Sequence, residues 1–334
     1  MDKITSLQVA ERAGVSQSAV SRVYTPGASA SAKTVEKVRK AAAELGYRPN
    51  MMARAMITGK SRIIGLVVAY LDNQFYPLAL QLLSNALQQK GYHILVFTGS
   101  SSHGASEEVM QELLDYQVDG IITASVGMTN DLTRRCAAAG IPVVMFNRGQ
   151  EGEAISSVTS ANVKGGRAVA EFLLSCGHRS IGHISGWAGS STGRDRQAGF
   201  CQVLAQQGIT PQIIDGKYDR EVAAAAAQSM MDASVPPDAI FVGNDHMALA
   251  VLDTLRYEMG LSVPNDVAII GYDDVPLAAW PAYNLTTMRQ PVNRMVEATV
   301  EALLRRIDDP SLPAQLIEID SPLIQRGTTK GPKI

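Results

Sequence analysis

Short apolar runs alternate with longer stretches of helical periodicity from about residue 62 onward, and this alternation limits the fold more than any other feature of the sequence. The runs are rich in branched apolar residues, which favours strands. They are Ile63–Ala69, Tyr92–Phe97, Gly120–Thr123, Val143–Phe146, Ser180–Ile184, Ala239–Val242 and Val267–Ile270. Strands that alternate regularly with helices predict a mainly parallel, doubly wound sheet.

The region is too long for a single sheet of this kind. Its length of roughly 270 residues predicts two similar lobes, because a single core rarely grows that large. We place the body at 62–334. Within it, lobe one covers about 62–158 plus 290–320, and lobe two covers about 159–289 plus 321–334. A final helix and strands, within 291–326, are expected to cross back between the lobes.

The composition favours an ordered globular chain, with 46% apolar and 19% charged residues. No run of about eighteen uncharged apolar residues occurs, and residues 1–6 lack the apolar stretch of a secretory signal. The three cysteines, Cys136, Cys176 and Cys201, are too widely spaced for a disulfide framework or a Cys-x-x-Cys metal site. We therefore expect a cytoplasmic protein with no membrane association, no metal and no bound cofactor.

Charge is distributed unevenly along the chain. Residues 1–62 carry eleven Lys and Arg against four Asp and Glu, which is +7, whereas residues 63–334 carry nineteen against twenty-eight, which is −9. A concentrated positive charge attracts polyanions through counterion release, so nucleic acid is a candidate partner. On charge alone, a solvated basic surface with no partner is equally consistent.

The basic segment has the pattern of three short helices. Capping residues and glycines predict helices at Ser6–Ala13, at Gln17–Tyr24 after the Gly14 turn, and between Ser31 and Gly46. This spacing is typical of a helix-turn-helix, although an ordinary three-helix subdomain would have the same periodicity. The face of the second helix away from the core carries side-chain types that bind base edges or phosphates, namely Gln17, Ser18, Ser21 and Arg22.

The order of residues in this segment resembles one known family. The strings Val9-Ala-Glu-Arg-Ala-Gly-Val-Ser16, Ala19-Val-Ser-Arg-Val23, Ser31-Ala-Lys-Thr34 and Glu44-Leu-Gly-Tyr-Arg-Pro-Asn50 are similar to the head of the lactose-repressor (LacI/GalR) family of bacterial regulators. The match covers residues 5–62 almost without gaps. The resemblance implies a DNA-binding head at 1–49 and a hinge at 50–61.

We assign the DNA contacts of this head as follows. Base readout is expected from Gln17, Ser18 and Arg22. Phosphate contacts are expected from Ser16, Ser21, Ser31, Thr34 and Asn50. The resemblance implies a hinge that inserts an apolar side chain into the minor groove, here through Ala53 and Met56. Met56 stands where the family usually has leucine, and it could instead pack on the body.

Polar and aromatic residues follow the expected strands of the body, where parallel sheets bind ligands. With two lobes, the strand ends face an interlobe cleft. We take as effector-site candidates Asp72, Phe75, Arg148, Arg196, Tyr218, Asn244 and Asp273. Arg, Asp and Asn pair with hydroxyls or carboxylates, and an aromatic offers a flat face to a sugar ring.

The family resemblance extends over nearly the whole body and implies a periplasmic-binding-protein-like fold. Arg196, Asn244 and Asp273 match effector contacts of the family, and Tyr218 matches an aromatic that stacks on the effector. Ala161 departs from the aspartate that many relatives carry there. Simpler roles stay open: Asp245 or Asp273 as a cap, Arg194 in an ion pair, and Phe75 or Trp187 in the core.

An enzyme reading has weak support. Gly189-Ser-Ser-Thr-Gly193 matches Gly-x-Ser-x-Gly, with Ser191 as the nucleophile. The only histidine after Ser191 is His246, directly after Asp245, and an adjacent acid cannot readily orient that ring. Cys176, His178 and His183 lack a fourth metal ligand of suitable spacing. A periplasmic sugar-binding protein would share the two lobes, but the basic head and the missing signal argue against it.

The sequence therefore predicts a helix-turn-helix head joined to an α/β body of two doubly wound lobes. We expect an effector-controlled homodimer that binds a pseudo-palindromic double-stranded operator and represses a carbohydrate or sugar-acid operon. A dimer is favoured over a tetramer, because no leucine heptads follow Leu323–Gly327. The expected effector is a sugar, a sugar acid or a sugar phosphate, and both induction and corepression stay open.

Overall fold

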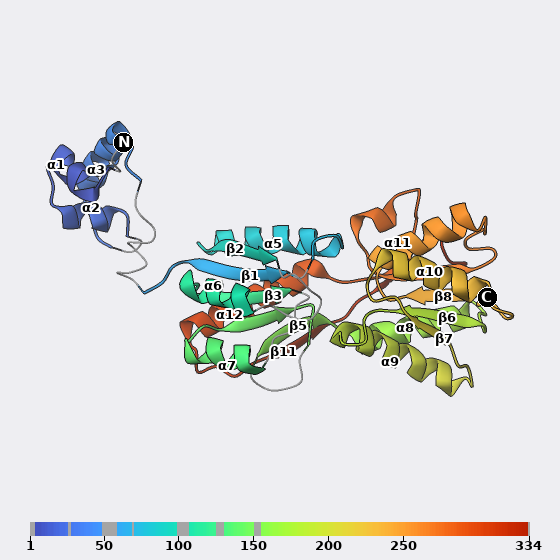
Figure 1. Ribbon diagram of the computed structural model, residues 1–334. Coiled ribbons are helices and arrows are strands. Elements are labelled where there is room, and N and C mark those ends of the chain that lie inside the picture. Colours follow the sequence, from blue (N-terminus) through green and yellow to red (C-terminus); the bar gives the residue numbers. More distant parts are fainter. Residues whose placement is uncertain are drawn as a thin grey trace. The chain divides into compact units, whose positions relative to one another are not determined.

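The computed structural model describes residues 4–25, 28–48, 59–68, 70–98, 107–124, 130–149 and 155–332. The chain divides into two compact units, Met1–Ser61 and Arg62–Ile334. We refer to them as the head and the body and describe each by itself (Figure 1).

The head contains three helices, α1 (Ser6–Ala13), α2 (Gln17–Val23) and α3 (Ala32–Leu45), so the predicted helices are confirmed. Local sequence explains their ends. Thr5 and Gln8 form the expected capping box on α1. Gly14 and Gly46 end α1 and α3 with left-handed backbone, at φ 65° and 68°, which glycine adopts at little cost.

Small apolar side chains hold the three helices together. Val9 of α1, Val20 of α2 and Val38 of α3 are all buried and share one cluster with Ala41 and Ala42. The side chains of α2 that lie outside this cluster include the exposed Gln17, Ser18, Ser21 and Arg22, which a partner could contact.

Lobe one of the body is a six-stranded, all-parallel sheet in the order β11-β5-β4-β3-β1-β2. Its strands are β1 (Ile63–Val68), β2 (His93–Thr98), β3 (Gly120–Ala124), β4 (Val143–Phe146), β5 (Ser156–Ser160) and β11 (Leu316–Ile319). Alternate residues of β1 enter different clusters: Leu66 meets α5 (Phe75–Gln89) and α12 (Val292–Asp308), whereas Val67 meets α6 (Glu107–Asp115) and α7 (Asn130–Ala138). Both faces of the sheet are thus covered.

Lobe two repeats this architecture in the order β12-β10-β9-β8-β6-β7, with only β12 antiparallel to its neighbour in the described residues. Its strands are β6 (Ile181–Ser185), β7 (Gln212–Asp215), β8 (Ala239–Val242), β9 (Ala268–Asp273), β10 (Thr286–Arg289) and β12 (Leu323–Ile324). One face packs on α8 (Asn162–Ser175) and α9 (Ser191–Gln206), the other on α10 (Arg220–Met231) and α11 (Asp245–Asp253). Figure 1 shows these pairs on opposite faces.

Short helical turns complete lobe two. A π-helical segment, η1 (Thr254–Glu258), continues α11, and a 3₁₀ turn, η2 (Pro276–Ala279), precedes β10.

No helix among the residues that the structure describes is long and apolar enough to cross a membrane.

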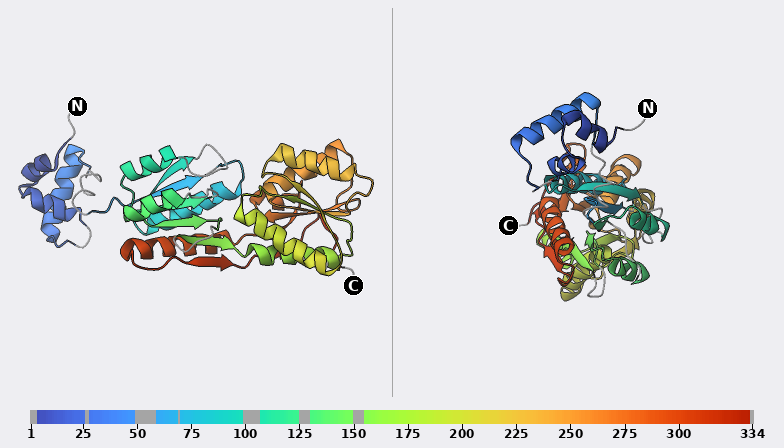
Figure 2. Two further views of the ribbon diagram at one scale, coloured as in Figure 1. Left: turned by 60° about the horizontal axis from the view of Figure 1, so that its bottom comes forward. Right: turned by 90° about the vertical axis from the view of Figure 1, so that its left-hand side faces the viewer.

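The lobes are connected at three places, after β5, after β10 and after β11. The connections are tied to one another by backbone hydrogen bonds, from Ala161 N to Ile319 O at 2.9 Å and from Arg289 N to Pro322 O at 2.8 Å. Helix α12 packs on lobe one, although the strand before it belongs to lobe two and the strand after it belongs to lobe one (Figure 2).

Candidate functional site

The body contains a cavity of about 220 Å³ to which both lobes contribute. Its lining residues are Tyr70, Asp72, Arg148, Trp187, Lys217, Tyr218, Asp219 and His246. Each follows the carboxyl end of a strand. The strand order reverses beside β1 in lobe one and beside β6 in lobe two. The cavity thus lies at the position where doubly wound sheets bind ligands.

The backbone at this edge adopts conformations that side chains rarely allow. Asn147, Lys217, Tyr218 and Asp274 have φ between 53° and 59°, and Asp273 has φ 134°. Such conformations cost on the order of 1–3 kcal/mol each and persist only where the surroundings impose them. Their concentration at the strand ends makes this edge a candidate functional site.

Tyr218 is held firmly at the cavity wall. Its hydroxyl lies 3.2 Å from Thr192 Oγ1 and 3.4 Å from Ser190 Oγ. Its ring lies against Gly186, where any Cβ would collide with the ring atoms. The aromatic face is therefore fixed in place before a ligand arrives.

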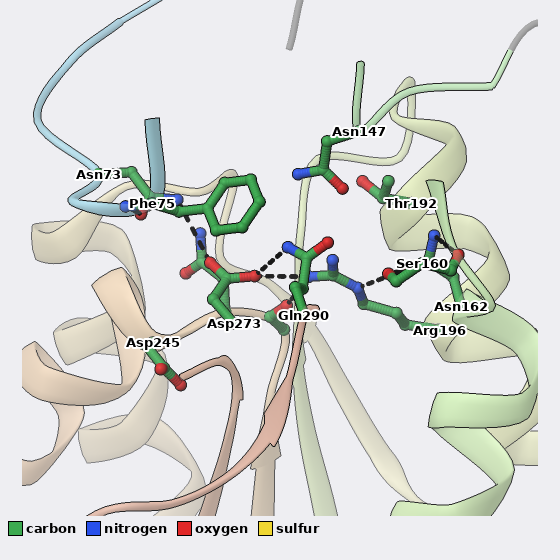
Figure 3. A network of polar contacts seen from close by, with 12 residues as sticks. Asn73, Phe75, Asn147, Ser160, Asn162, Thr192, Arg196, Asp245, Asp273 and Gln290 are labelled. Carbon is green, nitrogen blue, oxygen red and sulfur yellow. Dashed lines mark hydrogen bonds and ion pairs between the residues drawn. The ribbon is translucent and has the colours of Figure 1, made fainter. Parts of the chain in front are cut away.

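Arg196 belongs to a buried polar network that also includes Asn162 and Asp273 (Figure 3). Arg196 Nε donates to Asn162 Oδ1 at 2.8 Å, and Nη1 donates to Gly243 O at 2.7 Å. The guanidinium also covers the Tyr272 ring at 3.6 Å and lies 3.7 Å from Asp273 Oδ1. Only 2% of Arg196 is exposed, so the protein itself occupies this group.

Asp273 is bound from both lobes. It accepts hydrogen bonds from Gln290 Nε2 at 2.6 Å and, across the lobes, from Asn73 Nδ2 at 3.5 Å. Burial raises its pKa above the usual range, although Arg196 acts against this shift. Burial also raises the pKa of Asp245, and the charge of Asp273 adds to it. The negative charge of Asp273 therefore makes ionisation of the neighbouring Asp245 less favourable.

The pKa of His246 is shifted in the opposite direction. Burial and the nearby Arg220 hold its pKa below the usual value, although Asp72 and Asp219 act in the opposite direction. The neutral imidazole favoured at pH 7 can donate one hydrogen bond and accept another. Together with three aromatic rings, two cations and two carboxylates, it forms a lining suited to a small ligand rich in hydroxyl groups.

The structure places five of the seven predicted effector residues in two groups. Asp72, Arg148 and Tyr218 line the cavity. Arg196 and Asp273 belong to the buried network described above. Their contact with an effector, like that of the remaining two residues, stays a prediction.

The remaining two residues have structural partners. Phe75 is 2% exposed and stacks on Phe146 with ring centroids 6.1 Å apart, within the core of lobe one. The Asn244 side chain accepts a hydrogen bond from Met247 N and caps α11.

Sequence reasoning missed Tyr70, Lys217 and Asp219. It left Trp187 open between an effector contact and a core residue, and it considered His246 only as part of a catalytic site. The strand-end rule that identified Asp72 applies equally to Tyr70, two residues after β1. The signal for Tyr70 was therefore present in the sequence.

The head presents the predicted readout face. Gln17, Ser18, Ser21 and Arg22 are all exposed. Gln17 Nε2 donates to Ser6 Oγ at 2.9 Å, which holds the start of α2 beside α1. The Gln17 amide has a second N–H and an acceptor oxygen, so a base contact need not replace that hydrogen bond.

Two of the predicted phosphate-binding serines act as helix caps. Ser16 accepts from Ala19 N, and Ser31 accepts from Thr34 N, both at 3.2 Å. Asn50, Ala53 and Met56 lie outside the described residues. Their predicted contacts with phosphate and with the minor groove stay predictions.

Two segments of the chain match known families. Residues 7–50 match bacterial regulatory proteins of the lacI family, and residues 170–329 match the periplasmic binding protein-like domain. The HTH-type transcriptional repressor PurR of Vibrio atlanticus is 29% identical over 330 residues, which is 98% of each chain. The PurR repressor of Photobacterium profundum has the same identity and coverage.

Solved structures with similar folds include three regulators. The lac repressor dimer bound to operator and the anti-inducer ONPF has a TM-score of 0.87 at 27% identity, covering 98% of this chain and 99% of that one. A complex of the regulator CelR with cellobiose has a TM-score of 0.70 at 28% identity, covering 98% and 100%.

The third is a regulator from Alkaliphilus metalliredigens QYMF in complex with D-xylulofuranose. It has a TM-score of 0.73 at 26% identity and covers 81% of this chain and all of its own. These matches confirm the predicted fold class, a helix-turn-helix head followed by a periplasmic-binding-protein-like body.

Proposed function

Because this chain belongs to the LacI family of DNA-binding transcriptional repressors, we propose that a small carbohydrate or sugar acid bound in its interlobe cavity controls its binding to an operator. Like its repressor relatives, it is a regulator and not an enzyme. The observation that carries the proposal is the cavity itself, which is lined from both lobes at their ligand-binding edge.

The DNA-binding part of the proposal rests on α2. Its exposed face carries Gln17 and Arg22, whose side chains form paired hydrogen bonds with adenine and guanine. The surplus of positive charge in residues 1–62 adds affinity for any DNA sequence. In a homodimer, two such faces read the half-sites of a pseudo-palindromic operator.

The effector part rests on the chemistry of the lining. Tyr218 and Trp187 offer aromatic faces, while Arg148, Asp72 and His246 offer donors and acceptors for hydroxyl or carboxylate groups. Two of the similar regulators were solved with cellobiose and with D-xylulofuranose, which supports a carbohydrate. The effector must bind the two DNA-binding states unequally, by about 1–3 kcal/mol, to control them.

The operator is found by selecting binders from a pool of random duplexes. Arg22→Ala should then weaken binding by about 1–3 kcal/mol and relax discrimination at one base pair. Arg12→Ala is the matched control, because it removes the same charge from a side chain that pairs with Glu44 at 2.7 Å. Equal operator affinity of the wild type and Arg22→Ala would remove Arg22 from the readout.

The effector is found by a thermal-shift screen of sugars, sugar acids and purines with the full chain, because a ligand bound only by the folded state raises its stability. Tyr218→Ala and Arg148→Ala should each remove the shift. Tyr257→Ala, an exposed tyrosine outside the cavity lining, should keep it. A purine that gives the largest shift, lost in the same variants, would contradict the carbohydrate assignment but not the site.

A further inference from the structure

The segment Gly189–Gly193 resembles a nucleophile motif in sequence, but the structure gives each of its residues a different task. A Cβ at Gly189 would collide with the Trp187 ring, and one at Gly193 would lie 3.0 Å from the Tyr218 hydroxyl. Ser190 caps α9 by accepting a hydrogen bond from Gly193 N. Ser190 and Thr192 also contact the Tyr218 hydroxyl. The segment therefore supports Trp187 and Tyr218, which line the cavity.

Ser191 is the member of this segment that reaches the other lobe. Its Oγ accepts a hydrogen bond of 2.8 Å from the backbone N–H of Gly149. Ser191 opens α9 in lobe two, whereas Gly149 follows β4 in lobe one. The serine is 9% exposed, so water competes little for the bond.

Gly149 directly follows Arg148, which lines the cavity and is 7% exposed. A hydrogen bond to the N–H of Gly149 therefore restrains the peptide that carries the Arg148 side chain. The other cross-lobe hydrogen bond described above, from Asn73 to Asp273, is longer at 3.5 Å. The Ser191 contact is the shorter of these two ties between the lobes.

We propose that Ser191 is a positioning residue that latches lobe two to the turn after β4 and so fixes both the aperture of the cavity and the place of Arg148 within it. Ser191 acts through Gly149 rather than by contact with the ligand. Its consequence for effector binding rests on the proposed function, whereas its effect on the aperture does not.

The test uses tryptophan fluorescence of the full chain without DNA or effector. The sequence contains two tryptophans, and Trp280→Phe leaves Trp187 at the cavity as the single reporter. In that background, Ser191→Ala should shift the ratio of open to closed cleft by about fivefold, the equivalent of one ordinary hydrogen bond. Emission from Trp187 should move to longer wavelength, and acrylamide should quench it more strongly.

Controls separate the latch from a general loss of structure. Ser180→Ala removes a serine hydroxyl that donates to Pro236 O within lobe two, and it should leave Trp187 unchanged. Ser191→Thr keeps the accepting oxygen and should restore the wild-type signal.

The donor side gives an independent pair of variants. Gly149→Ala keeps the N–H, and its Cβ would lie 3.7 Å from Ser191 Oγ, an ordinary contact. It should therefore resemble the wild type. Gly149→Pro lacks the N–H and should resemble Ser191→Ala.

The outcomes are decisive in both directions. Equal quenching of Trp187 in the wild type and Ser191→Ala, with Gly149→Pro also unchanged, would overturn the latch. Because no operator or effector enters the measurement, that result would leave the proposed function standing. Conversely, a chain that binds no operator could still show the latch.

Discussion

Arg196 shows how a residue that is predicted to bind effector can also have several partners within the protein. Its guanidinium is used by Asn162, Gly243 and the Tyr272 ring, and it lies beside the buried Asp273. Sequence similarity can point to such a residue. It cannot tell whether the side chain contacts the ligand or holds other residues of the site in place. That distinction depends on the partners that folding brings together.

Replacement of Arg196 should therefore affect stability first. Arg196→Ala leaves Asp273 buried without its cation and should lower the free energy of unfolding by about 3–5 kcal/mol. Urea denaturation of the full chain measures the loss. Arg194→Ala, on an exposed side chain of the same helix, should cost far less. A loss below about 1 kcal/mol for Arg196→Ala would show that the guanidinium is free to serve a ligand instead.

A second residue-scale prediction concerns acid sensitivity. His183 is 1% exposed, stacks on Phe241 at 4.7 Å and has a ring nitrogen 2.9 Å from Phe241 O. Burial lowers its pKa to about 4. Because the unfolded chain binds the proton more tightly, with a pKa of about 6.5, this neutral histidine stabilises the fold above that pH and the stabilisation is lost as pH falls. The loss between pH 7 and pH 5 is about 2 kcal/mol.

The measurement compares the pH dependence of unfolding in two variants. His183→Leu should remove about that difference from the wild-type profile, while His93→Leu, on an exposed edge-strand residue, should retain it. The comparison is made between variants because the raised pKa values of Asp245 and Asp273 act with the opposite sign. A His183→Leu profile parallel to that of the wild type would exclude this histidine as the source.

At the scale of elements, the strands that could be predicted from the sequence are those made mainly of apolar residues. All seven predicted runs became strands, within three residues at their ends. Strand β5, Ser156–Ser160, was missed because four of its five side chains are hydroxyls, yet every one is buried. Its backbone pairs with β4 and β11, and the pairing with β11 is long-range. No local pattern encodes that pairing.

The start of α3 allows a sharp test of a mixed assignment. Ser31 caps the helix, and it is also predicted to bind phosphate. Ser31→Ala should cost about 1 kcal/mol of head stability, whereas Ser31→Gly should cost only a few tenths, because glycine is tolerated at an N-cap. If the hydroxyl also binds phosphate, both variants should weaken operator binding to a similar degree.

Two measurements separate these roles: thermal unfolding of the head transition and operator titration in the selected duplex. Operator affinity that follows stability, lost in Ser31→Ala but retained in Ser31→Gly, would leave Ser31 as a cap alone.

At the scale of the molecule, symmetry sets the expected assembly. A single head reads one half-site, so a pseudo-palindromic operator requires two chains related by a twofold axis. Light scattering of the full chain should give a mass near twice 35.7 kDa when free, and that mass plus one duplex with operator. A mass near four chains would contradict the expected dimer, and a monomer that binds operator with full affinity would contradict the two-headed reading.

The three connections between the lobes restrict how the body can move. Two bodies joined by a single strand are free to swivel and to slide, whereas three adjacent tethers, tied to one another at Ala161–Ile319 and Arg289–Pro322, leave mainly a bending motion about one axis. The direction of the conformational response is then a property of the tethers. Chemically different small molecules would all push the body along that same single coordinate and differ only in how far.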